Sequence, residues 1–242
     1  MMRSKRFLSV CRLASIMGAI LILLSACAYK GGGDHPVIRK FTWFSYVAGD
    51  DIRQACSHTS GERYRFVYNA VYNEQVRTYD ITPADDGRYQ VKIHVTSEVE
   101  LTWLDLDLNN PDLLKPWRPK ISVTNIGAAD LMILKRTLQN ARFFESRPPA
   151  GNISSISFYW VISACVDGIF SQNGYVWPAE NFEKAQFGKL LSAWDFTDIP
   201  VNPPRKTTKF SIYGTNDETQ YRNLFNLQFG SDGFIRHYIF IN

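Results

Sequence analysis

The stretch that decides the fold is residues 156–166, ISFYWVISACV. Apolar side chains occupy both alternating positions in its centre, which is typical of a strand that is buried on both faces. The dipeptide Asp167-Gly168 follows, and it suits a two-residue hairpin turn because both positions accept a positive φ. The stretch therefore predicts a central strand that turns back toward residue 177 and is covered by a helix on one side.

Two further Asp-Gly turns extend this pattern. Asp86-Gly87 separates an alternating stretch that ends near residue 81 from a return strand at residues 88–99, and Asp232-Gly233 separates two apolar stretches near the C-terminus. Helical stripes cover about residues 128–144 and 180–194. The fold class is thus predicted as α+β, an antiparallel sheet of hairpins with two helices packed on one face.

Other stretches place the remaining elements. Residues 41–47, FTWFSYV, are expected to form a first strand rich in aromatic side chains, and residues 51–56 a short helical turn. Residues 200–205 are rich in proline and mark a possible internal boundary. Apart from this boundary, residues 37–242 are expected to form a single α+β domain.

The N-terminus has the composition of an export signal. Residues 1–12 carry four basic side chains and no acidic one, residues 13–24 are apolar, and the small residues Ser25 and Ala26 precede Cys27. The apolar run is shorter than the roughly 20 residues that a membrane-spanning helix needs. This stretch therefore predicts a secretory signal.

The motif Leu24-Ser25-Ala26-Cys27 resembles the lipobox of bacterial lipoprotein signal peptides. The resemblance implies that residues 1–26 are removed, that Cys27 receives a diacylglyceryl group, and that its new amino group is acylated. Residues 27–36 would then be a lipidated tether to the membrane, because two or more acyl chains anchor a protein stably. Ala28 stands where an Asp would favour the inner membrane, so the resemblance implies the outer membrane, facing the periplasm. The alternatives are a plain secreted protein and an uncleaved anchor.

The net charge argues against a nucleic-acid partner. Four of the 27 Lys and Arg residues precede Cys27, so the remaining 23 balance the 23 acidic residues of the whole chain. The formal net charge of +4 thus belongs to the signal, and the mature chain is formally neutral.

The cysteines of the mature chain predict a disulfide. Cys11 leaves with the signal and Cys27 takes the lipid, so Cys56 and Cys165 remain in a compartment that permits disulfides. We expect these two to pair. The alternative is that both are separate buried thiols.

Motifs for catalysis, metals and cofactors are missing from the sequence. The four histidines are widely scattered, and Cys56-Ser57-His58 is too short for a zinc pattern. Residues 105–110, DLDLNN, resemble the start of a calcium loop, but Asn110 and Pro116 stand where an EF-hand needs Gly and Glu. His94 is expected on the exposed face of its strand. We therefore expect no metal site and no cofactor, and an enzyme is not favoured.

One stretch suggests a ligand surface. Its aromatic side chains could stack on sugar rings, and its arginines could bind carboxylate or phosphate. The alternative is ordinary packing of tyrosines across neighbouring strands, with arginine on the outer face. The residues of this candidate surface are Tyr64, Arg65, Tyr68, Tyr72, Arg77 and Tyr79.

Three functions remain open at this stage. The leading hypothesis is a non-enzymatic binding or envelope-assembly role, with the membrane as a partner through the lipid on Cys27 and envelope proteins or glycan as other partners. The second is a carrier of a small apolar ligand or lipid, which would need a pocket. The third is an envelope hydrolase with a site assembled in the fold, which would need a pocket that holds a buried carboxylate or histidine.

Overall fold

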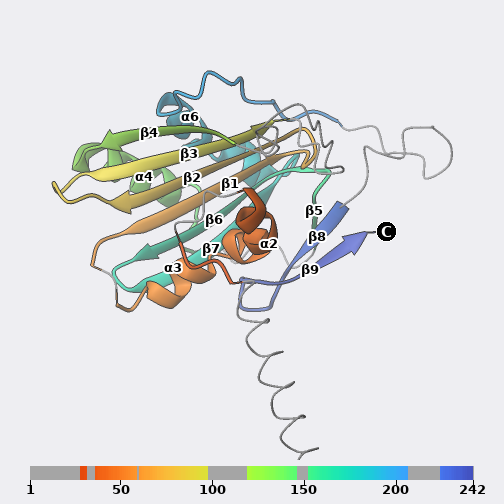
Figure 1. The fold of residues 1–242 in the computed structure, drawn as a ribbon, viewed down its shortest axis with the longest axis horizontal. Helices are drawn as coiled ribbons and strands as arrows, with labels where there is room; N and C mark the ends of the chain where they lie inside the picture. The colour runs from red at the N-terminus through yellow and green to blue at the C-terminus, as the bar shows by residue number, and fades with distance from the viewer. Residues whose placement is uncertain are drawn as a thin grey trace, which may run out of the picture.

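The computed structural model describes residues 28–31, 36–58, 60–97, 119–145, 152–206 and 224–241 (Figure 1). Its main feature is a six-stranded antiparallel sheet with the order β4-β3-β2-β1-β6-β7. A second, three-stranded sheet has the order β5-β8-β9. The strands of the large sheet are β1 (Arg63–Ala70), β2 (Gln75–Pro83), β3 (Tyr89–Ser97), β4 (Lys120–Ile126), β6 (Phe158–Val166) and β7 (Ile169–Val176). Those of the small sheet are β5 (Asn152–Ser154), β8 (Leu224–Phe229) and β9 (Ile235–Ile241).

The three predicted Asp-Gly turns are confirmed. Gly87 and Gly233 have φ values of 74° and 84°, and each lies in the turn of an antiparallel hairpin. Asp167 and Gly168 both have positive φ, as a two-residue type I′ turn requires. The predicted α+β class is also confirmed, but the third hairpin belongs to the second sheet and not to the first.

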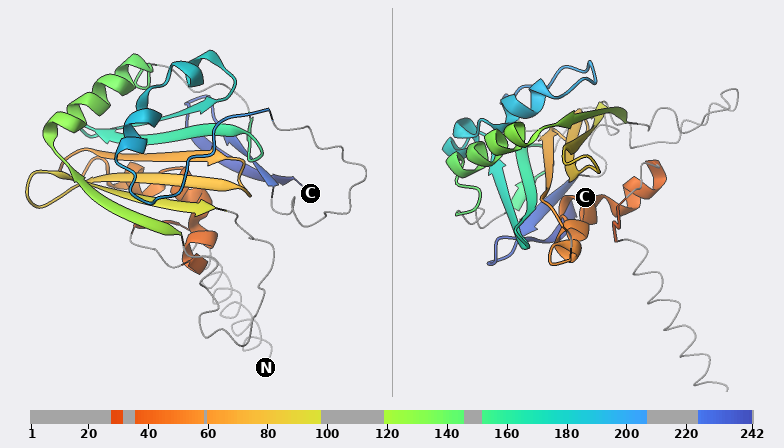
Figure 2. Two further views of the ribbon diagram at one scale, coloured as in Figure 1. Left: turned by 90° about the horizontal axis from the view of Figure 1, so that it is seen from above. Right: turned by 90° about the vertical axis from the view of Figure 1, so that its left-hand side faces the viewer.

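One face of the large sheet is covered by α4 (Ala128–Asn140), α5 (Glu180–Lys184) and α6 (Phe187–Ala193) (Figure 2). Leu134, Leu138 and Leu191 are fully buried there, as the helical stripe predicts. The helix expected at residues 180–194 is wrong in one respect, because the backbone is extended at Ala185. The restart at α6 places Phe187 in the core, against Phe66, Trp160 and Tyr175.

The opposite face of the large sheet is covered as well. It carries α2 (Pro36–Val47), α3 (Asp50–Ala55) and the small sheet (Figure 2). This second cover explains why β6 is apolar on both faces, with Ile162 in one core and Val161 in the other. It also corrects the expectation for His94, which is buried under this layer and not exposed.

The strand expected at residues 41–47 is wrong, because this stretch is the second half of α2. The apolar residues of this stretch fit both the two-residue period of a strand and the 3.6-residue period of a helix. Trp43, Tyr46 and Val47 are buried at i, i+3 and i+4, while Phe41 is exposed. The helical spacing is the one that tertiary packing uses.

A disulfide joins Cys56, just after α3, to Cys165 on β6, which confirms the predicted pair. The two Cα atoms are 5.5 Å apart, and the residues are separated by 109 positions in the chain. The bond ties the short helix to the C-terminal end of β6. Among the described helices, none is long and apolar enough to cross a membrane.

Candidate functional site

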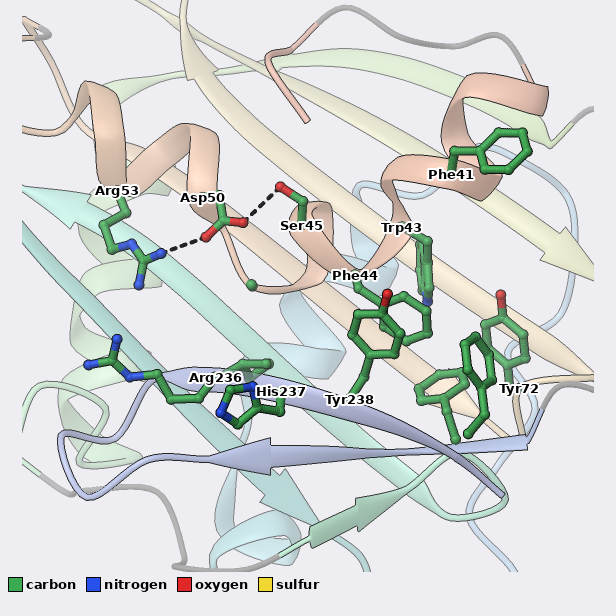
Figure 3. A pocket seen from close by; sticks show the side chains of 14 residues that line it. Phe41, Trp43, Phe44, Ser45, Asp50, Arg53, Tyr72, Arg236, His237 and Tyr238 are labelled. Carbon is green, nitrogen blue, oxygen red and sulfur yellow. Dashed lines mark hydrogen bonds and ion pairs between the residues drawn. The ribbon is translucent and has the colours of Figure 1, made fainter. Parts of the chain in front are cut away.

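A pocket of about 580 Å³ opens between the α2–α3 segment and the small sheet (Figure 3). Aromatic side chains dominate its lining, and a group of charged side chains lies at one end. The described lining residues are Phe41, Trp43, Phe44, Ser45, Ala48, Asp50, Arg53, Tyr72, Phe225, Ile235, Arg236, His237, Tyr238 and Phe240.

The aromatic part of the pocket is organised around Phe44. Its ring stacks on that of Tyr238 with centroids 3.4 Å apart, and it meets Phe225 edge to face at 5.0 Å. Tyr72 contacts Phe225 edge to face at 4.9 Å, so the aromatic wall runs from α2 across the small sheet to the β1–β2 turn. Such rings offer a large apolar contact area with few rotatable bonds.

A buried glutamine holds one side of the pocket in place. Gln172 on β7 donates through Nε2 to the carbonyl oxygen of Ala48 at 3.0 Å and to Oγ of Ser163 at 2.8 Å. Its Oε1 accepts the backbone N–H of Ile235 at 2.7 Å. Ala48 and Ile235 both line the pocket, so this one side chain fixes the end of α2 relative to β9.

Ser155 holds the other side in the same way. Its Oγ accepts the backbone N–H of Phe225 at 3.0 Å, and its carbonyl oxygen accepts that of Tyr72 at 2.8 Å. The same carbonyl oxygen accepts Nδ2 of Asn69, which is buried. The aromatic wall is therefore held by buried polar groups and not by apolar packing alone.

The charged end of the pocket combines α2, α3 and β9. The Ser45 hydroxyl donates to Asp50 at 2.8 Å, and the Arg53 guanidinium donates to the same carboxylate at 2.7 Å. Arg236 and His237 come from β9, and both residues are exposed. Figure 3 shows Arg53 and Arg236 toward one end of the pocket, and Phe41 and Tyr72 toward the other.

The segment that follows Cys27 docks beside this pocket. The backbone N–H of Tyr29 donates to Oγ of Ser45 at 3.0 Å, and its ring meets that of Tyr46 edge to face at 4.9 Å. The hydrogen bonds thus run from Tyr29 through Ser45 to Asp50 and Arg53. The pocket lies at the point where the N-terminal segment joins the domain.

The candidate ligand surface of the sequence is not a single exposed surface. Tyr64, Tyr68, Arg77 and Tyr79 are all buried on the face that α4 and α6 cover. Tyr68 stacks on Trp160 with centroids 4.6 Å apart, which agrees with the tyrosine part of the alternative interpretation. The part that placed arginine on the outer face is wrong, because Arg65 and Arg77 are both buried. Burial also raises the pKa values of the Tyr68 and Tyr79 hydroxyls well above their usual range.

Arg65 lies on the opposite face, where it joins two carboxylates. It contacts Asp51 at 2.7 Å and Asp80 at 2.6 Å, and its guanidinium lies 3.7 Å from the ring centroid of Tyr46. Burial alone would raise the pKa of Asp80, but Arg65 and the Tyr46 hydroxyl hold it below its usual value. This arginine therefore fixes α2 and α3 to the sheet.

Arg77 has a similar role on the first face. It forms a buried ion pair with Asp195 and donates to the carbonyl oxygens of Ile199 and Pro200. Gln75 donates to the same Pro200 carbonyl at 2.8 Å. The proline-rich segment that the sequence suggests as an internal boundary is thus tied to β2. Of the six candidates, Tyr72 is the one that lines the pocket.

Sequence reasoning missed most of the pocket. Phe44 and Tyr238 are distant in the chain, and neither stands in a recognisable motif. The helical spacing of Trp43, Tyr46 and Val47 is the signal that could have placed α2 correctly. Cys27 and residues 105–110 lie outside the described residues.

Among the described lining residues, one carboxylate and one histidine are the groups with acid–base chemistry. The carboxylate, Asp50, is half-buried and already bound by Ser45 and Arg53, and His237 is exposed. The described part of the chain also has no group of three or more His, Cys, Asp or Glu side chains that could hold a metal ion. The arrangement suits binding of an apolar molecule through aromatic contacts.

Comparisons with protein-family models, with curated proteins and with solved structures found no match to this chain.

Proposed function

We propose that this chain is a lipid-anchored envelope protein that binds a small apolar ligand or lipid in the pocket between α2, α3 and the small sheet. The observation that carries the proposal is the pocket itself, with about 580 Å³ of space against an aromatic wall. Ligand pockets in proteins are commonly of this size and predominantly apolar. The carrier hypothesis requires such a pocket, whereas a purely structural accessory does not.

The position of the N-terminal segment supports the membrane part of the proposal. Cys27 precedes Tyr29 by two residues, and two residues span at most about 7 Å. Because Tyr29 is bound to Ser45, a lipid on Cys27 would lie close to the pocket. Phe41, Tyr238 and Phe240 are all roughly half-exposed or more at the pocket, as suits a surface that receives an apolar molecule from a bilayer.

The membrane anchor can be tested separately from the pocket. Replacing Cys27 with Ser should abolish lipid labelling and leave the precursor uncleaved, because the thiol is the site of modification in the lipobox. Normal processing of the variant would contradict the lipoprotein assignment and favour a secreted protein or an uncleaved anchor.

Native mass spectrometry of the full-length protein, extracted gently from membranes, tests the function. The expected mass is the lipidated chain plus one small molecule. Tyr238→Ala should lower the bound fraction, because it removes the ring that stacks on Phe44. The matched control is Met132→Ala on α4, which is similarly exposed on the other face. A bare lipidated chain in every preparation would overturn the proposal.

The assembly-accessory role is a second candidate, and one observation favours it. In the described part of the chain β9 pairs with β8 along one edge, and Tyr238, Ile239 and Phe240 are each about half-exposed. An apolar edge strand can pair with a strand of another chain. Detection of other protein chains in the same mass spectrum, without a small molecule, would favour this role over the carrier.

A further inference from the structure

The pocket has two chemically different ends. One end is built from aromatic rings of α2, the β1–β2 turn and the small sheet. The other end presents Arg53 from α3 and Arg236 with His237 from β9 (Figure 3). A ligand that fills the pocket would therefore contact apolar and cationic groups at the same time.

Both arginines keep donors for a ligand. A guanidinium has five N–H donors, and it binds carboxylate or phosphate through pairs of them. Among the described residues, the Arg53 side chain donates to Asp50 and that of Arg236 donates to Asp232. Their side chains remain 37% and 53% exposed, so the unused donors are accessible.

The unused guanidinium donors at this end favour an anion. Asp50 is the carboxylate among the described lining residues, and it accepts hydrogen bonds from Ser45 and Arg53. Asp232 pairs with Arg236 but is not part of the lining. The two arginines are thus each paired with one carboxylate, and their remaining N–H donors are the groups that an anionic head would bind.

We infer that the ligand is an anionic amphiphile, with a phosphate or carboxylate head at Arg53 and Arg236 and an apolar chain along the wall formed by Phe44, Tyr72 and Phe225. This inference rests on the proposed function and adds the ligand class to it. Charge-assisted hydrogen bonds set the orientation of the head, and ring contacts bind the chain.

The experiment uses full-length lipidated protein in nanodiscs of neutral lipid, with protein-free nanodiscs as the blank. The probes are octyl phosphate, octanoate, octyl glucoside and octyltrimethylammonium, which share one chain length and differ in the head. Trp43 lines the pocket, so tryptophan fluorescence reports binding. Octyl phosphate and octanoate should bind about tenfold more tightly than octyl glucoside, as one or two charge-assisted hydrogen bonds imply.

Variants assign the preference to the two arginines. Arg53→Gln and Arg236→Gln should each reduce the affinity for octyl phosphate toward that for octyl glucoside, whose own affinity should stay unchanged. That unchanged affinity shows that the pocket is still folded. The matched control is Arg142→Gln, an arginine whose side chain is 74% exposed after α4. Its binding should equal that of the wild type.

Each other outcome overturns a defined part of the argument. Equal affinity for all four probes would overturn the anionic head but leave the apolar pocket in place. A preference for octyl phosphate that survives both arginine variants would have the same meaning. Displacement of octyl phosphate by an equal concentration of inorganic phosphate would show that the chain contributes nothing, so the ligand would be a free anion. Failure of every probe to bind would overturn the proposed function itself.

Discussion

The two faces of the large sheet differ in how they are closed. The face under α4 and α6 is closed mainly by apolar side chains, with Leu134, Leu138 and Phe187 fully buried, and by the one buried ion pair of Arg77 with Asp195. The face under α2, α3 and the small sheet is held by polar links as well as by its own apolar cluster, including the ion pairs of Arg65 and the hydrogen bonds of Gln172. The difference teaches that polar links can fix the position of α2, α3 and the small sheet without side chains filling all the space between them. This leaves room for a pocket.

Removal of the disulfide should have the largest effect. The double variant Cys56→Ala with Cys165→Ala is expected to lower the free energy of unfolding by about 4 kcal/mol, because the bond closes a long loop in the unfolded chain. It also frees α3 from β6, so ligand binding in the pocket should weaken too. Urea unfolding and the fluorescence titration measure the two effects. An unchanged affinity would show that the polar links alone position α3.

Breaking the ion pair of the other face should lower stability without touching the pocket. Asp195→Ala leaves the Arg77 charge buried without its carboxylate, with an expected cost of about 3 kcal/mol in urea unfolding. The double variant Arg77→Met with Asp195→Ala should recover much of this loss, since no charge is then left alone. If Asp195→Ala also weakens ligand binding, the two faces are coupled and the comparison fails.

Gly49 tests the close contact between the α2–α3 turn and the sheet. It has a φ of 67°, and an added Cβ would lie 2.6 Å from Oγ of Ser163. Gly49→Ala should therefore lower the free energy of unfolding by about 2–4 kcal/mol, from backbone strain and from overpacking together. Gly87→Ala is the matched control, because Gly87 has a φ of 74° but nothing within 4 Å of an added Cβ. Equal losses in the two variants would mean that the Ser163 contact has no cost.

The smallest effect is a pH dependence from Asp80. Its pKa is lowered in the folded chain, so its contribution to stability is complete above the usual Asp value near about 4 and disappears as the pH falls through the lowered pKa. Asp80→Asn should flatten the loss of unfolding free energy below about pH 5.

Asp86→Asn is the control for this measurement. The pKa of Asp86 is also lowered, by hydrogen bonds from Arg88, but this pair is exposed and solvent screens it. The Asp86 variant should therefore follow the wild type. A profile for Asp80→Asn that equals the wild-type profile would show that the acid sensitivity comes from other groups.

The fold could be predicted where the signal is local. Turns that need positive φ at two adjacent positions attract Asp and Gly, and an apolar run on both parities demands cover on both faces. Residues 41–47 could not be assigned in this way, because their aromatic side chains fit both periods. The choice between the periods came from the packing of Trp43 and Tyr46 on the second face.

The candidate site was harder to predict for a related reason. Arg65 and Arg77 have the composition of a ligand surface, yet each is buried against carboxylates from other elements, Asp51 and Asp80 for the first and Asp195 for the second. Within the sequence these partners lie between 14 and 118 positions away. Nothing in the local pattern separates a buried, paired arginine from an exposed one.

The sequence by itself determined the α+β class, the three Asp-Gly hairpins and the pairing of Cys56 with Cys165, because each follows from backbone preference, side-chain periodicity or elimination. The tertiary structure alone decided the second layer, the burial of the two arginines and the pocket. These depend on side chains that meet from distant segments, such as Phe44 with Tyr238 and Gln172 with Ile235. A pocket is a property of how two surfaces fail to fill the space between them, and no single stretch of chain contains that information.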